Sequence, residues 1–180
     1  MQEKTKLFET ERLVLRKFEK TDAECVYNNY ASKDNVTEFL SWKSHKSLDD
    51  TKSYLENFVL PAYESEDTYR WAIVLKETNE VIGCIDVVRL NRNFKKVELG
   101  WVLDDNHWGK ALMPEAAKVI RDYMIEEGFV RIEAHHNVAN PKSGRVMEKI
   151  GMMYEGTLRK SAMNNDGVIV DMKMYAYVVD

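Results

Sequence analysis

One segment constrains the fold of this chain more than any other. The apolar run Val97–Leu103 is followed by the turn Asn106–Ala116, which contains one glycine, and then by a helical pattern over Met113–Glu127. Apolar residues lie on one side of that helix, Gly128 follows its end, and Val130–Ala134 alternates like a strand. This succession of strand, helix and strand predicts a sheet with a helix packed against it.

Patterns on either side extend this sheet. Arg12–Arg16 alternates like a strand. Thr21–Glu24 then supplies a capping box for a helix that runs to about Ser32. A second helix begins at Ser47 and is ended by Pro61. Asn140 before Pro141 starts a short helix. Further strands are expected at Tyr69–Leu75, Val81–Val88, Gly156–Arg159 and Val168–Tyr175. The predicted order is β-α-α-β-β-β-α-β-α-β-β, an α+β fold with a mixed sheet in a single domain over residues 1–180.

Charge and cysteine content exclude several classes of protein. The net charge of -4 argues against a dedicated nucleic-acid binder, which needs a basic surface, but is compatible with an amine substrate. Cys25 and Cys84 lack metal or redox spacing, so we expect reduced thiols. Met1–Lys6 is followed by no apolar signal region, and no apolar run approaches membrane-spanning length, so we expect a cytoplasmic protein without membrane contact.

The turn before the long helix is the first candidate site. Trp108–Leu112 fits neither the P-loop nor the dinucleotide pattern, because each needs more glycines. A helix start nevertheless presents unpaired amides and partial positive charge, which suit a phosphate or pyrophosphate, and Lys110 would add a charge. The alternative is that Gly109 only makes a tight turn and Lys110 is solvated.

The element order, this turn and the segment Asn140–Met152 together resemble the GNAT acetyltransferases, whose fold is the acyl-CoA N-acyltransferase fold. Within them the chain resembles the branch of ribosomal-protein alanine N-acetyltransferases and their relatives, from Glu11–Arg16 through Glu98–Leu103 and Tyr154–Lys160. The resemblance implies an acetyl-CoA-dependent N-acetyltransferase. Its acceptor would be a primary amine, either a protein N-terminus or a small molecule such as a polyamine or an aminoglycoside.

The resemblance also assigns a cofactor site. The acetyl-CoA pyrophosphate loop, Gln/Arg-x-x-Gly-x-Gly/Ala, falls on the six residues Trp108, Gly109, Lys110, Ala111, Leu112 and Met113. Ala111 stands where the pattern has glycine, and Met113 where it has glycine or alanine. Alanine fits a right-handed backbone here, but a positive φ would strain it. The resemblance further places the pantetheine arm against Val102 and Leu103, with Asn140 contacting the arm and Ser143 near the sulfur; both residues are equally suited to capping their own helix.

Acetyl transfer needs a proton acceptor for the amine, an oxyanion donor and an acid for the thiolate. By resemblance, a backbone amide near Leu103 is the oxyanion donor. We take Glu98 as the candidate base and Ser143 as the candidate acid, with Glu133 or a chain of water molecules as alternatives for the base and Tyr154 for the acid.

Three further points concern a metal site, a non-catalytic role and the oligomeric state. Adjacent strand residues point to opposite faces, so His135 and His136 are not expected to share a metal ion, and we assign no metal. The departures at Ala111 and Met113 leave open a non-catalytic acyl-CoA-binding or regulatory module. The paired final strands are compatible with a homodimer.

Overall fold

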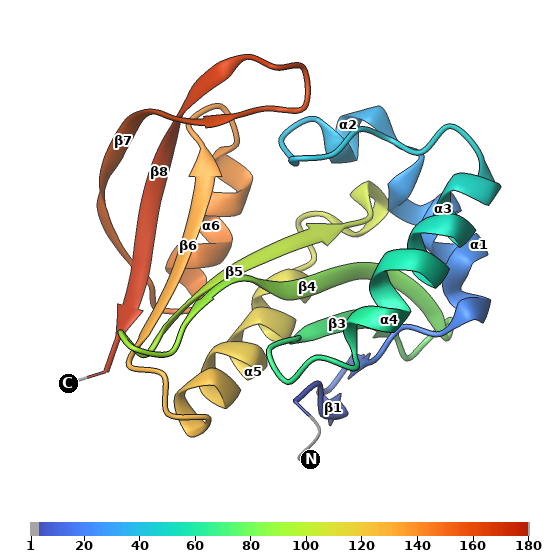
Figure 1. The fold of residues 1–180 in the computed structure, drawn as a ribbon, viewed down its shortest axis with the longest axis horizontal. Coiled ribbons are helices and arrows are strands. Elements are labelled where there is room, and N and C mark those ends of the chain that lie inside the picture. The colour runs from blue at the N-terminus through green and yellow to red at the C-terminus, as the bar shows by residue number, and fades with distance from the viewer. Residues whose placement is uncertain (1–3, 180) are drawn as a thin grey trace. The chain divides into compact units, whose positions relative to one another are not determined.

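Figure 1 shows the computed structural model, which describes residues 4–179, so the first half of the segment Met1–Lys6 lies outside the described chain. The chain divides into two compact units. The first comprises residues 4–37, 43–86 and 101–112, and the second comprises residues 38–42, 87–100 and 113–179. Strands β4 (Glu80–Asn91) and β5 (Lys96–Leu103) run through both units.

The first unit holds an antiparallel set of strands. Strand β2 (Leu13–Arg16) pairs with β1 (Phe8–Glu9) and with β3 (Arg70–Leu75), and β3 pairs with the first half of β4. Leu13 and Leu15 are fully buried, as the alternation predicted. The strands predicted at Arg12–Arg16, Tyr69–Leu75 and Val81–Val88 are thus confirmed, whereas β1 was not predicted.

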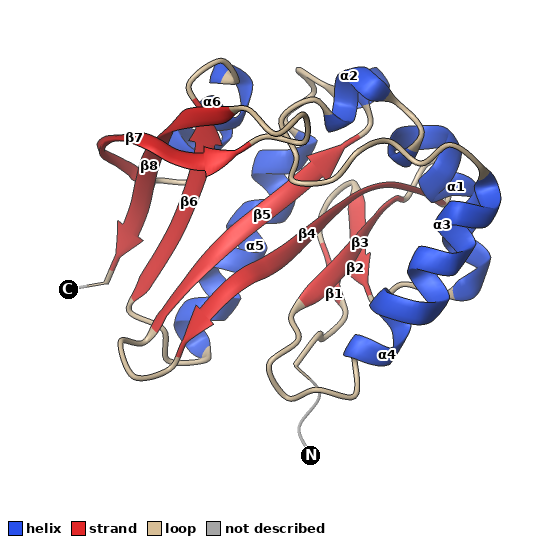
Figure 2. Ribbon diagram, turned by 45° about the horizontal axis from the view of Figure 1, so that its top comes forward, coloured by secondary structure: helices blue, strands red, loops and turns tan. Residues whose placement is uncertain are grey.

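The helices of the first unit are short and cluster together in Figure 2. They are α1 (Ala23–Val26), α2 (Asp34–Thr37), α3 (Leu48–Tyr54) and α4 (Leu60–Ala62), with π-helical turns over Tyr27–Ala31 and Leu55–Val59. The turn α2 was not predicted.

Two predicted helix boundaries are wrong and one is confirmed. The first capping box forms around Asp22 and not Thr21, because the Asp22 carboxylate accepts the N–H of Glu19 at 2.8 Å and a 3-10 turn precedes α1. Pro61 lies inside α4, so the helical run that begins with α3 and passes through the π-helical turn ends one residue after the proline, at Ala62, and not before it. Ser47 caps α3 as predicted, accepting the N–H of Asp50 at 3.2 Å.

The second unit is built on β6 (Arg131–Asn137). This strand pairs in parallel with β5 over Lys96–Glu98 and antiparallel with β8 (Ile169–Val178), which pairs with β7 (Met153–Met163). Helices α5 (Leu112–Glu126) and α6 (Pro141–Lys149) were both predicted, and α6 packs beside β6 (Figure 2). The buried residues of this unit include Val97, Leu99, Ala116, Ala117, Ile120, Met124, Ile132 and Ala134. Strand β6 ends three residues later than predicted and therefore includes both adjacent histidines.

The hydrogen-bonded strand order is β1-β2-β3-β4-β5-β6-β8-β7, a mixed sheet of eight strands. The predicted α+β class and element order are confirmed, with β1 and α2 added. No helix among residues 4–179 is long and apolar enough to cross a membrane.

Candidate active site

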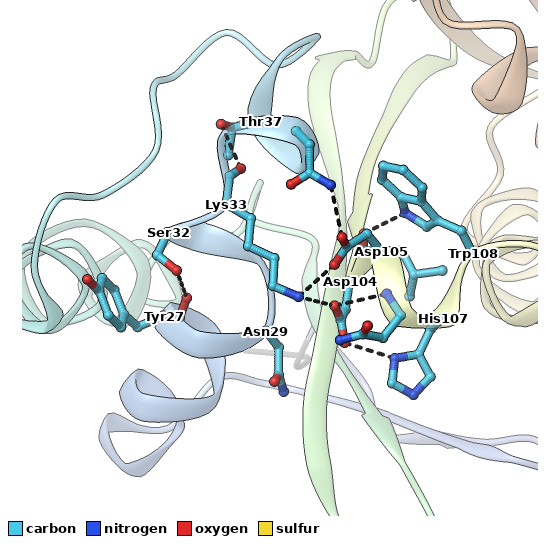
Figure 3. A network of polar contacts seen from close by, with 12 residues as sticks. Tyr27, Asn29, Ser32, Lys33, Thr37, Asp104, Asp105, His107 and Trp108 are labelled. Atoms are coloured by element: carbon cyan, nitrogen blue, oxygen red, sulfur yellow. Dashed lines mark hydrogen bonds and ion pairs between the residues drawn. The ribbon is translucent and has the colours of Figure 1, made fainter.

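The turn after β5 is fixed by a network of charged groups in the first unit (Figure 3). Lys33 places its Nζ 2.7 Å from Oδ1 of Asp104 and 2.6 Å from Oδ1 of Asp105. Asp104 also accepts the N–H of Asn106 at 3.2 Å and lies 3.0 Å from Nδ1 of His107. Asp104 is the residue that follows β5, and its buried carboxylate therefore ties the end of this strand to Lys33 and to the turn at Asn106 and His107.

Asp105 is held as firmly as its neighbour. Asn35 donates its side-chain amide to Oδ2 of Asp105 at 2.9 Å. The hydrogen bonds from Lys33 and then Asn35 lower the pKa of Asp105. Burial would lower the pKa of Lys33, but its bonds to both aspartates outweigh burial and raise it. Lys33 and Asp105 are thus charged at neutral pH, and their ion pair helps the turn to keep its shape.

The backbone of the turn has an unusual conformation. Gly109 has φ +79° and Ala111 has φ +59°, so the right-handed alternative for Ala111 is wrong. A left-handed alanine costs about 1 to 2 kcal/mol, which other contacts of the turn must offset. Two such contacts are the bond from the Trp108 indole to the Leu103 carbonyl, at 2.8 Å, and the bond from Arg12 to the Lys110 carbonyl, at 2.9 Å.

The side chains of this turn divide into exposed and buried ones. Gly109, Lys110 and Ala111 are exposed, whereas Leu112 and Met113 are each only 3% exposed. Met113 therefore directs its bulk into the core, although the family pattern has a small residue at that position.

Val102 and Leu103 form the half-buried end of β5. The Val102 carbonyl faces β4, because a Cβ added at Gly83 would collide with that oxygen. Successive residues of a strand direct their polar backbone groups to opposite edges, so the N–H of Leu103 points away from β4.

Two glutamates stand directly opposite each other in the second unit, where Glu98 of β5 is in register with Glu133 of β6. Glu133 receives Arg131 Nε at 2.6 Å and Lys96 Nζ at 3.3 Å. Burial alone would raise the pKa of Glu133, but these two bonds outweigh it and lower the pKa. Glu133 is thus held as a paired structural charge.

Glu98 also has two partners, but they are a histidine and an exposed arginine. Its Oε1 lies 3.1 Å from Nδ1 of His135, and its Oε2 lies 3.5 Å from Nη1 of Arg89, whose side chain is 82% exposed. Of the two facing glutamates, Glu98 is the one whose arginine partner lies largely in solvent.

The adjacent histidines point to opposite faces of β6. His135 contacts Glu98, whereas His136 lies against Gly144 of α6, and its Nδ1 donates to the Asn137 carbonyl at 2.7 Å. Burial lowers the pKa of His136. Within residues 4–179, no three His, Cys, Asp or Glu side chains gather as metal ligands do.

Helix α6 carries the two residues predicted to contact the cofactor. Asn140 caps the helix by accepting the N–H of Ser143 at 3.4 Å. The Ser143 hydroxyl makes no hydrogen bond to any residue in the described range 4–179, so it has no capping role there. Tyr154, the alternative acid, is exposed, and its hydroxyl lies 2.8 Å from Oγ1 of Thr157.

Cys84 is a poor alternative nucleophile. Both thiols are free, and loss of water around Cys84 raises the pKa of its thiol, which disfavours the reactive thiolate.

The sequence interpretation missed the network of Lys33, Asn35, Asp104 and Asp105. A signal existed in Asp104, an aspartate placed directly after a strand and before a turn. Nothing local marked Lys33, which lies 71 positions from Asp104. The contact between Glu98 and His135 was also missed, because it depends on the register of β5 and β6.

Comparisons with known proteins show the family to which the chain belongs. Residues 12–153 match the family described as the acetyltransferase (GNAT) domain. The chain is 29% identical over 173 residues to the uncharacterized N-acetyltransferase YoaA of Bacillus subtilis, with 96% of each chain covered. It is 27% identical over 143 residues to the ribosomal-protein-serine acetyltransferase of Escherichia coli, with 78% of each chain covered.

Solved structures show the same fold. One is the ribosomal L7/L12 alpha-N-protein acetyltransferase RimL in complex with coenzyme A. Its TM-score is 0.84 at 18% identity, and the match covers 97% of this chain and 99% of that one.

Proposed function

This chain is an N-acetyltransferase of the GNAT family, and from that premise we propose that it transfers the acetyl group of acetyl-CoA directly to a primary amine. We propose that residues 1–180 carry one such domain. The acceptor would be a protein N-terminal α-amine, as the names of two relatives suggest for those proteins, or a small amine. An α-amine has a pKa near ~8 and a lysine amine near ~10.4, so the first needs less help to become neutral.

The turn after β5 carries the cofactor part of this proposal. Its charged network fixes the chain immediately before α5, whose first amides lack intrahelical partners. The CoA pyrophosphate would accept hydrogen bonds from this start of α5, over the six residues from Trp108 to Met113, with Lys110 adding positive charge. The exposed Gly109 and Ala111 leave the backbone accessible there.

The pantetheine and thioester would lie along the end of β5. In this proposal Val102 and Leu103 pair with the pantetheine arm, and the Leu103 N–H, which points away from β4, donates to the thioester oxygen as negative charge develops. Asn140 contacts the arm.

Ser143 and Glu98 would move the protons. The Ser143 hydroxyl, unoccupied by other residues of the described chain, protonates the departing sulfur. Glu98 is the proposed proton acceptor because its partners are a histidine and an exposed arginine, whereas Glu133 is held by Arg131 and Lys96. Direct transfer in a ternary complex is favoured over an acetyl-enzyme on Cys84 because burial raises the pKa of that thiol and disfavours its thiolate.

Two measurements test this function. Acetyl-CoA at 100 times its Kd should stabilise the fold by about 2.7 kcal/mol, seen as a higher midpoint of thermal unfolding. Thiol release should then be assayed with N-terminal peptides and small amines. Stabilisation without turnover on any acceptor would favour a non-catalytic acyl-CoA-binding module, and the absence of stabilisation would refute both functions.

A further inference from the structure

Glu98 and His135 touch on one face of the second unit. Nδ1 of His135 is 3.1 Å from Oε1 of Glu98, and each side chain retains 15% of its exposure. The contact follows from the strand register, because Glu98 is opposite Glu133 and His135 comes two residues after Glu133 on the same face. Each member of the pair is therefore positioned by a different strand of a parallel ladder.

The surroundings make His135 the main partner of Glu98. Arg89 is the other charged group at that carboxylate, but its side chain is largely in solvent, where ion pairs contribute little. Lys96 and Arg131 are engaged by Glu133. Across the next strand, His135 is in register with Met174, which carries no charge. The imidazole is thus the partly buried group that Glu98 faces.

We propose that His135 is the proton acceptor of the acetyl transfer, using Nε2, and that Glu98 orients it through Nδ1. This inference rests on the function proposed above and refines the role of Glu98. A carboxylate beside Nδ1 favours the tautomer that carries the proton on that nitrogen, which leaves a lone pair on Nε2. No group in the described residues 4–179 forms a hydrogen bond with that Nε2.

The step balances as follows. Nε2 of His135 takes one proton from the acceptor ammonium, and the amine lone pair forms the N–C bond at the thioester carbonyl carbon. The tetrahedral intermediate collapses as the C–S bond breaks, with its electron pair going to sulfur. Sulfur takes the hydroxyl proton of Ser143, and the Ser143 oxygen then takes the surplus proton from the acetylated nitrogen. The imidazolium, stabilised by Glu98, releases its proton to water, so the products are the acetamide, the CoA thiol and one proton.

The tautomer of His135 provides a test that needs no turnover. The chain has four histidines, so 15N-histidine NMR of the full protein is simple to assign, with His135→Gln identifying the signal. We expect an unprotonated Nε2 in the neutral wild-type ring, and a shift of population toward Nε2–H in Glu98→Gln. An Nε2–H ring in the wild type would overturn the proposal, whether or not an acceptor has been found.

Kinetics provide the second test. We expect His135→Gln to lower kcat by roughly 100-fold without changing the Kd of acetyl-CoA. The loss should be larger for an alkyl amine of pKa near ~10 than for an α-amine near ~8, because the variant no longer removes the ammonium proton. A purely structural role of His135 would affect both acceptors equally.

Arg89→Gln is the matched control, since it removes the other cation at the same carboxylate. We expect a loss of at most about threefold for that surface pair, equal for the two acceptors. A His135→Gln enzyme with full turnover, or an acceptor-dependent loss in Arg89→Gln as large as that in His135→Gln, would contradict the assignment. A wild-type enzyme that acetylates no amine would refute the proposed function and leave the tautomer to decide this one.

Discussion

In the turn after β5, Lys33 bonds both Asp104 and Asp105, whereas Glu98 in the preceding strand faces a histidine and an exposed arginine. The lysine fixes the charges and the backbone of the turn in one state. Glu98 has no lysine partner and lies beside an imidazole that can take up a proton. The difference matches two tasks: holding an anionic cofactor needs groups that stay as they are, and transferring a proton needs groups that change charge.

The largest effect should be a loss of turnover on substitution of Glu98. Glu98→Gln removes the charge that orients and stabilises the His135 imidazolium, and we expect kcat to fall by roughly 100-fold, measured by thiol release. Glu133→Gln is the control on the facing strand. It should lower thermal stability because Arg131 and Lys96 lose a charged partner, yet retain most of the turnover. Equal losses of turnover in both variants would remove the distinction between the two glutamates.

The next largest effect should be a loss of stability on substitution of Lys33, which bonds both aspartates of the turn. Lys33→Met leaves Asp104, whose side chain is 3% exposed, without its cation, so we expect the free energy of unfolding to fall by about 2 to 3 kcal/mol. Chemical denaturation measures this loss. Lys46→Met is the matched control, because the Lys46 side chain is 76% exposed and its pairing is worth at most about 1 kcal/mol. Similar losses in both would show that the network does not hold the turn.

Ser143→Ala should separate chemistry from binding. Because its hydroxyl has no partner among residues 4–179, the substitution breaks no hydrogen bond of the fold. We expect kcat to fall by about tenfold, less than for the base, while the Kd of acetyl-CoA and the thermal midpoint stay near wild type. Parallel changes in kcat and Kd would give Ser143 a binding role instead.

Ala111→Gly should stabilise the protein, whereas the preceding substitutions lower turnover or stability. It relieves a left-handed alanine, and after the greater chain entropy of glycine we expect a gain of about 0.5 to 1 kcal/mol in unfolding free energy, with unchanged or tighter acetyl-CoA binding. Gly109→Ala in the same turn is the reverse control and should destabilise. Clearly weaker acetyl-CoA binding by Ala111→Gly would show that the alanine is part of the cofactor site.

The smallest expected effect is a loss of thermal stability at low pH, where the stabilising contribution of Asp105 is lost. The folded pKa of Asp105 lies below its unfolded value near ~3.9, so its stabilising contribution is complete above that pH and is lost as the pH falls toward the folded value. Thermal midpoints between pH 6 and pH 3 should therefore fall more steeply for the wild type than for Lys33→Met. Identical slopes would argue against this coupling.

The sequence predicted the features that depend on local pattern. Alternation placed the main strands, and Asn140 and Ser47 marked two helix starts, because a cap and its first turn are adjacent in the chain. The resemblance supplied the candidate cofactor turn. Long-range relations were not predictable: the pairing of Lys33 with Asp104 and the neighbourhood of Glu98 and His135 arise only when strands and helices distant in sequence meet. The conformation of Ala111 was left open between a right-handed backbone and a strained positive φ, and only the structure shows the positive φ.

The dissociation constant of acetyl-CoA, measured by calorimetry for the wild type, Glu98→Gln and Lys33→Met, tests this division of tasks most directly. We predict that Glu98→Gln binds like the wild type, whereas Lys33→Met, while still folded, binds at least about tenfold more weakly because the turn is no longer held in place. Weakened binding in Glu98→Gln together with unchanged binding in Lys33→Met would contradict the account.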